Sequence, residues 1–263
     1  MKCIRVSSSI ANFREKLYQK YSSYERWSLF TLFSPTLFFG AYHWLDWLRI
    51  LAHRGRRVIF WCGSDILAID SNPFWRGLLS NMTAEHVCEN LGEQRLLRDL
   101  GISARIHPMF FDDISGFTPS FKPSKTPHVF LTSHPRAGAY GVGIVESIAQ
   151  QVPEITFHIY GVEGQSHENI VYHGLVSNTQ FNNEIRNYQA ALRLNDFDGF
   201  SETLGKSILL GQYPISKIFY PFIDGFKTNS QLIHLLKGLK TKTKPNIVGY
   251  NYWKKILSKP CEL

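Results

Sequence analysis

The sequence is poor in cysteine, in charged residues and in uninterrupted apolar runs. Its four cysteines lie far apart among 263 residues and form no C-x-x-C pair, so the sequence predicts neither a zinc site nor a disulfide framework. The most apolar stretch, residues 29–48, is broken by Pro35, His43 and Asp46 and is a poor candidate for a membrane span. No apolar segment of the secretory type follows Met1, so we expect a cytoplasmic protein.

Apolar residues are plentiful enough for a large core. The chain is 44% hydrophobic and 14% aromatic, which excludes a disordered or low-complexity protein. The net charge of +8 lies at the two ends, because residues 1–30 carry six basic and two acidic groups and residues 217–263 carry nine and two. This distribution favours contact with an anionic membrane surface at the inner face over a central nucleic-acid groove, and solvated surface lysines also explain it.

Short apolar runs alternate with helical patterns in two series along the chain. Residues 112–127 separate the series and are rich in Pro, Ser, Gly and Asp without periodicity, as in a linker. The alternation predicts two Rossmann-like α/β domains with parallel sheets flanked by helices. We expect a basic helical lead-in at 1–30, a reduced N-terminal domain at 31–111, a C-terminal domain at 128–240 and a helical tail at 241–263.

Two loops in the second series contain candidate functional residues, because ligands bind at the carboxyl ends of parallel strands. The loop after residues 128–132 contains Arg136, Gly138 and Gly141 and precedes a helix, which is typical of a phosphate cradle and also of a simple turn. It lacks the G-x-G-x-x-G spacing of a dinucleotide site. In the second loop, Asp198 precedes Ser201, which is a natural helix N-cap.

A third loop lies in the first series, in the sequence Cys62-Gly63-Ser64-Asp65. Gly63 permits a sharp turn, and Asp65 either holds a polar substrate or caps the next segment. No charged residue adjacent to Cys62 in sequence would activate its thiol, so a buried structural cysteine is the simpler interpretation.

Read together, four segments in this order resemble the group 1 (family-four-like) glycosyltransferases, two-domain enzymes of the GT-B fold. The resemblance covers about 160 residues, and no single motif in it is specific. The segments are residues 59–65 (IFWCGSD), 89–108, 157–174 (FHIYG followed by ENIVYHG) and 198–215 (DGFS…GQYPI).

The resemblance implies a retaining glycosyltransferase that moves a sugar from a nucleotide-sugar donor to a glycan, lipid-linked or protein acceptor, as in polysaccharide biosynthesis. The implied reaction needs no metal and no cofactor beyond the donor. Arg136 would neutralise the diphosphate, and Asp198 would orient the hexose. Donor contacts would come from the second domain, and acceptor-side contacts from the first. The implied donor residues are Gly138, Gly141, Ser201, Glu202, Thr203 and Lys206, and the implied acceptor-side residues are Gly63, Ser64 and Asp65.

Three positions depart from the family pattern. The acidic residue that would grip the ribose is Lys206 here, Cys62 replaces a histidine, and Arg136 stands without its usual lysine partner. An ammonium group donates hydrogen bonds and favours phosphate over hydroxyl groups. These departures leave a second interpretation open, a non-catalytic relative that binds a nucleotide sugar or a glycan. We expect no nucleic-acid partner.

Overall fold

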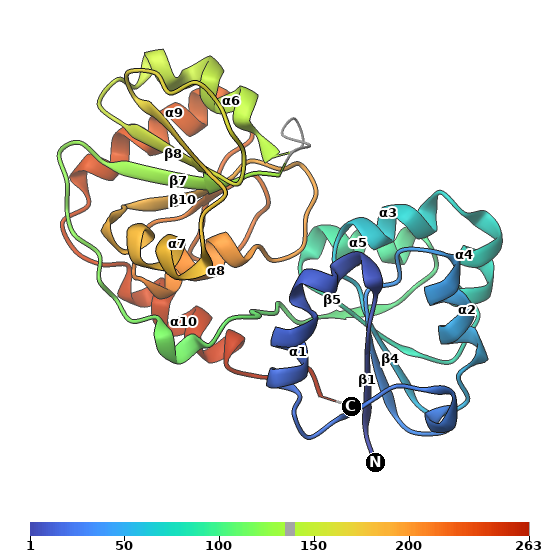
Figure 1. Ribbon diagram of the computed structural model, residues 1–263. Coiled ribbons are helices and arrows are strands. Elements are labelled where there is room, and N and C mark those ends of the chain that lie inside the picture. The colour runs from blue at the N-terminus through green and yellow to red at the C-terminus, as the bar shows by residue number, and fades with distance from the viewer. Residues whose placement is uncertain (135–139, 263) are drawn as a thin grey trace. The chain divides into compact units, whose positions relative to one another are not determined.

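Two parallel six-stranded sheets organise the chain (Figure 1). The computed structural model describes residues 1–134 and 140–262. Contacts divide the chain into two compact units, the first containing Met1–Asp112, Phe197–Phe200 and Lys259–Leu263 and the second Asp113–Asp196 and Ser201–Ser258. Both units have the α/β architecture with parallel sheets that the sequence predicts.

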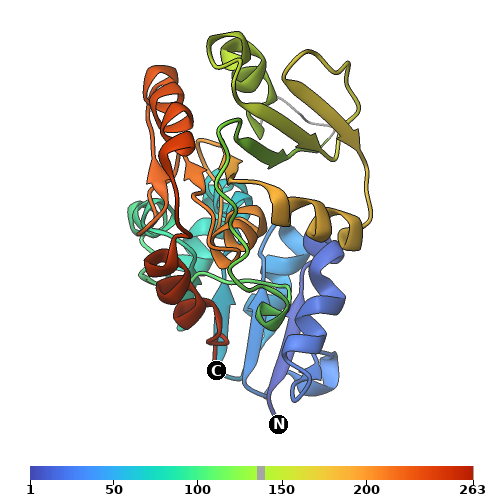
Figure 2. The same ribbon diagram turned by 90° about the vertical axis from the view of Figure 1, so that its left-hand side faces the viewer.

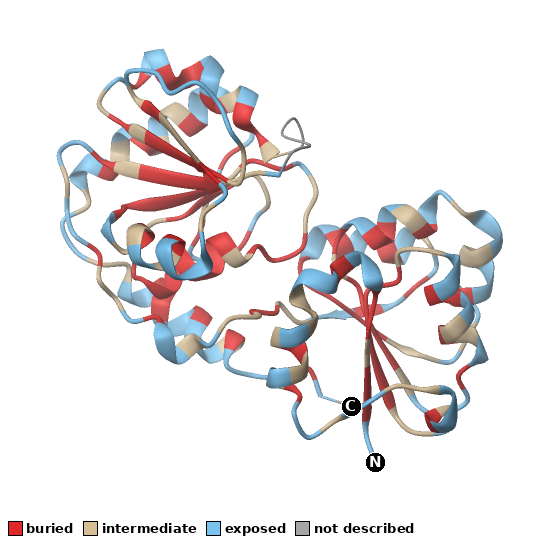
Figure 3. Cartoon of the chain, in the orientation of Figure 1, coloured by how far each residue is buried: buried red, intermediate tan, exposed pale blue. Residues whose placement is uncertain are grey.

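The sheet of the first unit has the strand order β2-β1-β3-β4-β5-β6, with every neighbouring pair parallel. Its central strands are short apolar runs buried on both faces, as expected for a parallel sheet (Figure 3). The strands are β1 (Cys3–Val6), β2 (Glu25–Arg26), β3 (Thr36–Phe39), β4 (Arg57–Phe60), β5 (Glu85–Cys88) and β6 (Ala104–Ile106).

Helices cover both faces of this sheet. Successive side chains of a strand point to opposite faces, so neighbouring apolar residues of one strand pack against helices on different faces. Phe38 and Ile59 pack on one face with Trp47 and Ile66, and Phe39 packs on the other with residues of the first helix. The helices are α1 (Arg14–Lys20) on the second face, with α2 (Trp44–Ala52), α3 (Ser64–Asp70), α4 (Pro73–Ser80) and α5 (Leu91–Asp99) contributing to the first.

The sheet of the second unit has the order β12-β11-β10-β7-β8-β9 and is also parallel throughout. Val129, Phe157 and Leu192 form its core together with apolar residues of the helices on one face. The strands are β7 (His128–Thr132), β8 (Thr156–Tyr160), β9 (Ile170–Gly174), β10 (Ala190–Arg193), β11 (Ile215–Ser216) and β12 (Asp224–Gly225). Figure 2 shows the same strands and helices from the side.

Side-chain caps begin most helices of the second unit, so their start positions follow from the sequence. Ser177, Ser201 and Asn246 each accept a backbone N–H in the first turn, and Thr228 forms a capping box with Gln231. The helices are α6 (Val142–Ile148), α7 (Asn178–Glu184), α8 (Glu202–Leu209), α9 (Asn229–Gly238) and α10 (Ile247–Leu257).

The predicted helical lead-in at 1–30 is wrong in its first residues. Cys3–Val6 forms a strand inside the first sheet, hydrogen-bonded between β2 and β3. Four residues are too few to show strand alternation, and Arg5 hides the apolar pattern, because its charge is neutralised only in the fold, by Asp46. The last helix, α10, ends at Leu257, before the end of the predicted helical tail at 241–263. Lys259–Leu263 belong to the first unit. Among the described residues, no helix is both long and apolar enough to cross a bilayer.

Candidate functional site

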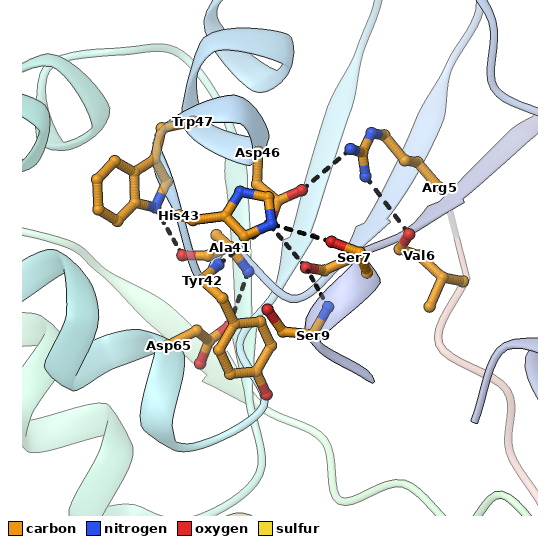
Figure 4. A network of polar contacts seen from close by, with 11 residues as sticks. Arg5, Val6, Ser7, Ser9, Ala41, Tyr42, His43, Asp46, Trp47 and Asp65 are labelled. Carbon is orange, nitrogen blue, oxygen red and sulfur yellow. Dashed lines mark hydrogen bonds and ion pairs between the residues drawn. The ribbon is translucent and has the colours of Figure 1, made fainter. Parts of the chain in front are cut away.

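A network of buried polar groups organises the carboxyl edge of the first sheet (Figure 4). Asp46 is 2% exposed; its Oδ2 accepts a hydrogen bond from Ser7 Oγ at 2.6 Å, and its Oδ1 pairs with Arg5 at 3.0 Å. The loop after β1 is thereby fixed to α2. At its surface, Ser8 Oγ lies 3.0 Å from His43 Nε2. The carboxyl edge therefore presents the Ser8 hydroxyl and the His43 imidazole next to side chains that are fixed by hydrogen bonds.

Asp65, predicted on the acceptor side, is fully buried. Its carboxylate accepts the backbone N–H of Ala41 and of Cys62, each at 3.0 Å. Burial raises its pKa to about 7 against the effect of these hydrogen bonds. Asp65 therefore joins the loops after β3 and β4. Ser64, the first residue of α3, is exposed.

Gly63 and Cys62 lie in the turn between β4 and α3. Gly63 has φ 91°, and a Cβ atom there would lie 3.0 Å from the backbone nitrogen of Gly199. Burial raises the pKa of the Cys62 thiol well above its ordinary value, and the nearby carboxyl of Asp65 raises it further. The thiol is therefore protonated at neutral pH and is a poor nucleophile, in agreement with a structural cysteine.

Asp198, the predicted catalytic carboxylate, lies in a four-residue segment that packs with the first unit, Phe197–Phe200. Its carbonyl oxygen accepts a hydrogen bond from Asn90 Nδ2 at 2.8 Å. The backbone N–H of Phe200 donates to Glu89 Oε2 at 3.1 Å. Sequence reasoning missed Glu89 and Asn90 as functional candidates. Two polar residues directly after a buried strand were the available signal.

In the second unit, the predicted donor residues of α8 surround its N-terminus. Ser201 Oγ accepts the backbone N–H of Thr203, and the Thr203 hydroxyl lies 2.8 Å from that of Thr132 at the end of β7. Glu202 is the first residue of the helix. The helix start is thus joined to the carboxyl edge of the sheet. Arg136 and Gly138, also predicted here, lie outside the described residues.

Lys206 is 4% exposed, and its ammonium group is held by protein side chains. Nζ donates to Asn182 Oδ1 at 2.9 Å and to Asn178 Oδ1 at 3.2 Å, both on α7. It also lies 5.1 Å from the centre of the Phe181 ring. These contacts direct Lys206 toward α7.

Gly141 caps α6 in the left-handed conformation, with φ 81°. A Cβ atom at this position would overlap the Leu194 side chain. We expect Gly141→Ala to lower the free energy of unfolding by about 1–3 kcal/mol, because both the backbone strain and the overlap oppose it. Thermal unfolding would measure the loss.

Gly143 provides the matched control, two residues further along in α6. No atom lies within 4 Å of a Cβ placed there. Gly143→Ala should stabilise the protein by about 0.5–1 kcal/mol, because alanine favours the helix. Equal effects of the two substitutions would contradict the conformational role of Gly141.

A cavity of ≈ 450 Å³ lies beside α6. Two carboxylates line it, Glu146 and Glu163, and Tyr172 donates to Glu146 at 2.7 Å. Carboxylates accept hydrogen bonds from hydroxyl groups and repel phosphate. The cavity wall therefore suits a hydroxyl-bearing group better than a diphosphate.

Three histidines on neighbouring strands form a hydrogen-bonded series that the sequence did not predict. His158 lies between His128, at 2.8 Å, and His173, at 2.9 Å, and its ring stacks on Tyr188. The pKa of His158 is lowered to about 3, chiefly by burial and also by the two neighbouring histidines. The described residues hold no group of three His, Cys, Asp or Glu side chains arranged for a metal ion.

Solved structures with a similar fold are known, although no protein-family model and no curated protein sequence matches the chain. The structure of HepE from Anabaena in complex with UDP and glucose is similar over 97% of this chain and 95% of its own, with a TM-score of 0.62 and 9% identity. The lipopolysaccharide outer core galactosyltransferase WaaB matches with a TM-score of 0.60 and 16% identity over 95% and 78% of the two chains.

The pneumococcal O-GlcNAc transferase GtfA, in complex with UDP and GlcNAc, matches with a TM-score of 0.58 and 12% identity. The alignment covers 84% of this chain and 54% of GtfA, so the chain spans about half the length of that relative. The two parallel sheets with flanking helices have the GT-B glycosyltransferase fold, which confirms the fold class that the sequence predicts.

Proposed function

We propose that the protein is a glycosyltransferase that moves a hexose from a nucleoside diphosphate sugar to a glycan, lipid-linked or protein acceptor. The observation that carries this proposal is the similarity to HepE, which extends over 97% of this chain and comes from a complex with UDP and glucose. The helix start at Ser201 and Thr203, joined to the end of β7, supports a donor site at the carboxyl edge of the second sheet.

In the proposed reaction, the bond between the anomeric carbon and the β-phosphate oxygen breaks, and an acceptor hydroxyl oxygen bonds to the same face of that carbon. The hydroxyl proton passes to the departing diphosphate. Arg136 and the backbone N–H groups at the start of α8 stabilise the negative charge of the leaving group, and Asp198 orients the hexose. In this proposal, electrostatic stabilisation of the leaving group takes the place of a metal ion.

The test is a calorimetric binding panel of UDP, GDP, ADP, CMP and dTDP sugars, followed by assays for release of the nucleotide. Because UDP occupies both the HepE and GtfA structures, we expect a UDP-sugar to bind with micromolar affinity and to be turned over. A folded sample that binds none of the panel would contradict the proposal.

A non-catalytic sugar-binding protein is the second candidate. The placement of Lys206 favours it, because the position expected to grip the ribose is occupied by a buried ammonium group held on α7. Tight binding of a nucleotide sugar without turnover, in the presence of candidate glycan acceptors, would support this candidate over the enzyme.

Exposed aromatic residues in the loop before β3, at the amino edge of the first sheet, support contact of the first unit with a membrane surface. Phe30 is 99% and Phe33 is 79% exposed in the loop before β3, and the backbone of exposed Arg54 hydrogen-bonds to Leu32 in this loop. Exposed aromatic groups beside basic groups bind anionic bilayers. This loop is therefore the surface that we propose for contact with an anionic membrane.

Vesicle sedimentation tests this membrane contact. We expect the protein to bind vesicles that contain anionic phospholipid and Phe30→Ser to weaken binding by about tenfold, since a buried aromatic side chain contributes about 1.5–3 kcal/mol. Phe219→Ser, at a position that is 68% exposed in the second unit, is the matched control. Equal binding of wild type and Phe30→Ser would contradict the contact.

A further inference from the structure

Three polar residues follow β5 into α5 and are almost completely buried. Glu89 is 5% exposed, Asn90 is 4% exposed and Glu93 is 0% exposed. Buried polar groups are costly unless they are hydrogen-bonded. Their partners therefore indicate what these residues do.

Two of these side chains hold the backbone on both sides of the Asp198 peptide unit. Asn90 Nδ2 donates to the Asp198 carbonyl at 2.8 Å, and Glu89 Oε2 accepts from Phe200 N–H at 3.1 Å. Between them, Gly199 approaches so closely that a Cβ atom would overlap the Glu89 carboxylate. Neighbouring residues of one loop thus fix three successive residues more than a hundred positions away in the sequence.

The two anchoring side chains are themselves fixed by α5. Asn90 Oδ1 caps the helix by accepting Glu93 N–H at 3.0 Å, and Glu93 Oε2 accepts Glu89 N–H at 2.6 Å. The remaining Glu89 oxygen accepts Met109 N–H at 3.2 Å. Burial raises the pKa of both glutamates well above the ordinary value. This arrangement leaves the two anchors little freedom to rotate.

We propose that Glu89 and Asn90 are positioning residues that hold the Asp198 backbone so that its carboxylate meets the transferred sugar in one orientation. This inference rests on the proposed function. A displacement of about 1 Å in a reacting group can reduce a rate by roughly 10²-fold. Two hydrogen bonds and one close glycine contact are the means by which the fold prevents such a displacement.

Asn90→Ser separates positioning from helix capping. Serine is as good an N-cap as asparagine, but its hydroxyl is too short to reach the Asp198 carbonyl. We expect kcat to fall by about tenfold, with an unchanged affinity for the nucleoside diphosphate and an almost unchanged melting temperature. Asn246→Ser is the matched control, because Asn246 caps α10 in the same way, and it should leave kcat unchanged.

Glu89→Gln provides a second, isosteric variant. In this variant the side-chain amide nitrogen replaces one carboxylate oxygen and faces a backbone N–H that this oxygen accepts in the wild type. A donor then faces a donor, so kcat should fall as in Asn90→Ser. Hydrogen exchange gives a readout independent of turnover. The Phe200 amide should exchange faster in both variants than in the wild type, and the Asn246→Ser control should leave it unchanged.

Three results would overturn the positioning role. The first is wild-type kcat and wild-type exchange in both variants. The second is faster exchange at Phe200 in an enzyme whose kcat does not change. The third is an equal fall in kcat, nucleotide affinity and melting temperature, which indicates a purely structural role. Failure of the proposed function is recognised separately, in the wild type alone, by the absence of turnover with every donor of the panel; the role in positioning the sugar then fails with it.

Discussion

Asp198→Ala should reduce turnover of the preferred nucleotide sugar by 10²-fold or more, which is the size of effect expected on loss of a key transition-state contact. Asp198 is half-buried, and its backbone is held by Asn90 and, through Phe200, by Glu89. A carboxylate in this place accepts hydrogen bonds from sugar hydroxyls and orients the hexose. The measurement is steady-state kinetics together with calorimetric titration of the nucleoside diphosphate.

Asp196→Ala is the matched control for this substitution. The Asp196 carboxylate is 85% exposed and pairs with Lys217 at the surface, where an ion pair contributes little. Its removal should change turnover less than twofold. A folded Asp198→Ala protein with a near-normal rate would show that the carboxylate has been assigned the wrong role.

The second large effect is a loss of stability in mild acid, caused by the buried histidine of β8. His158 has a pKa lowered to about 3 in the folded protein, first by burial and then by His128 and His173, whereas in the unfolded chain it titrates near its ordinary value of about 6.5. At pH values between about 3 and about 6.5, the unfolded chain binds a proton on this histidine that the folded protein does not bind. Stability is therefore complete above about pH 6.5 and falls as the pH is lowered.

One such histidine costs about 1.4 kcal/mol per pH unit in this range, so about 2–3 kcal/mol is lost between pH 6.5 and pH 4.5. His158→Phe removes the titrating group and keeps a ring in the stack, and should be less sensitive to acid than the wild type. The difference in free energy of unfolding between the two proteins, measured from pH 7.5 to pH 4.5, isolates this contribution.

The difference is needed because Asp65 acts in the opposite direction. Its raised pKa of about 7 makes the folded state bind the additional proton, so stability falls as the pH rises toward 7. His234→Phe, at an exposed position of α9, is the control and should keep the acid sensitivity of the wild type. A difference between wild type and His158→Phe that stays constant with pH would contradict the argument.

The apolar run at residues 128–132, which the sequence places before a ligand-binding loop, forms strand β7 over the same residues. Sequence patterns missed Cys3–Val6, where Arg5 interrupts the run and needs Asp46, far along the chain, for its neutralisation. Short elements whose charged residues are paired only in the fold give no local signal.

The candidate site was predictable to a similar extent. The Asp198 loop and the cap at Ser201 follow from local residue chemistry. The positions of Glu89 and Asn90 against that loop depend on a contact across more than a hundred residues, which periodicity and spacing do not reveal. The partners of Lys206 on α7 likewise could not be seen in the sequence.

The route of the chain has a practical consequence for cutting the protein into pieces. Residues Phe197–Phe200 and Lys259–Leu263 return to the first unit after the chain has entered the second. Cys261 is fully buried, and its N–H donates to Tyr21 at 2.9 Å. A fragment ending at residue 112 would lose both returning segments and expose the apolar surface they cover. Circular permutation or grafting of these segments, rather than simple truncation, is the way to obtain an isolated N-terminal half.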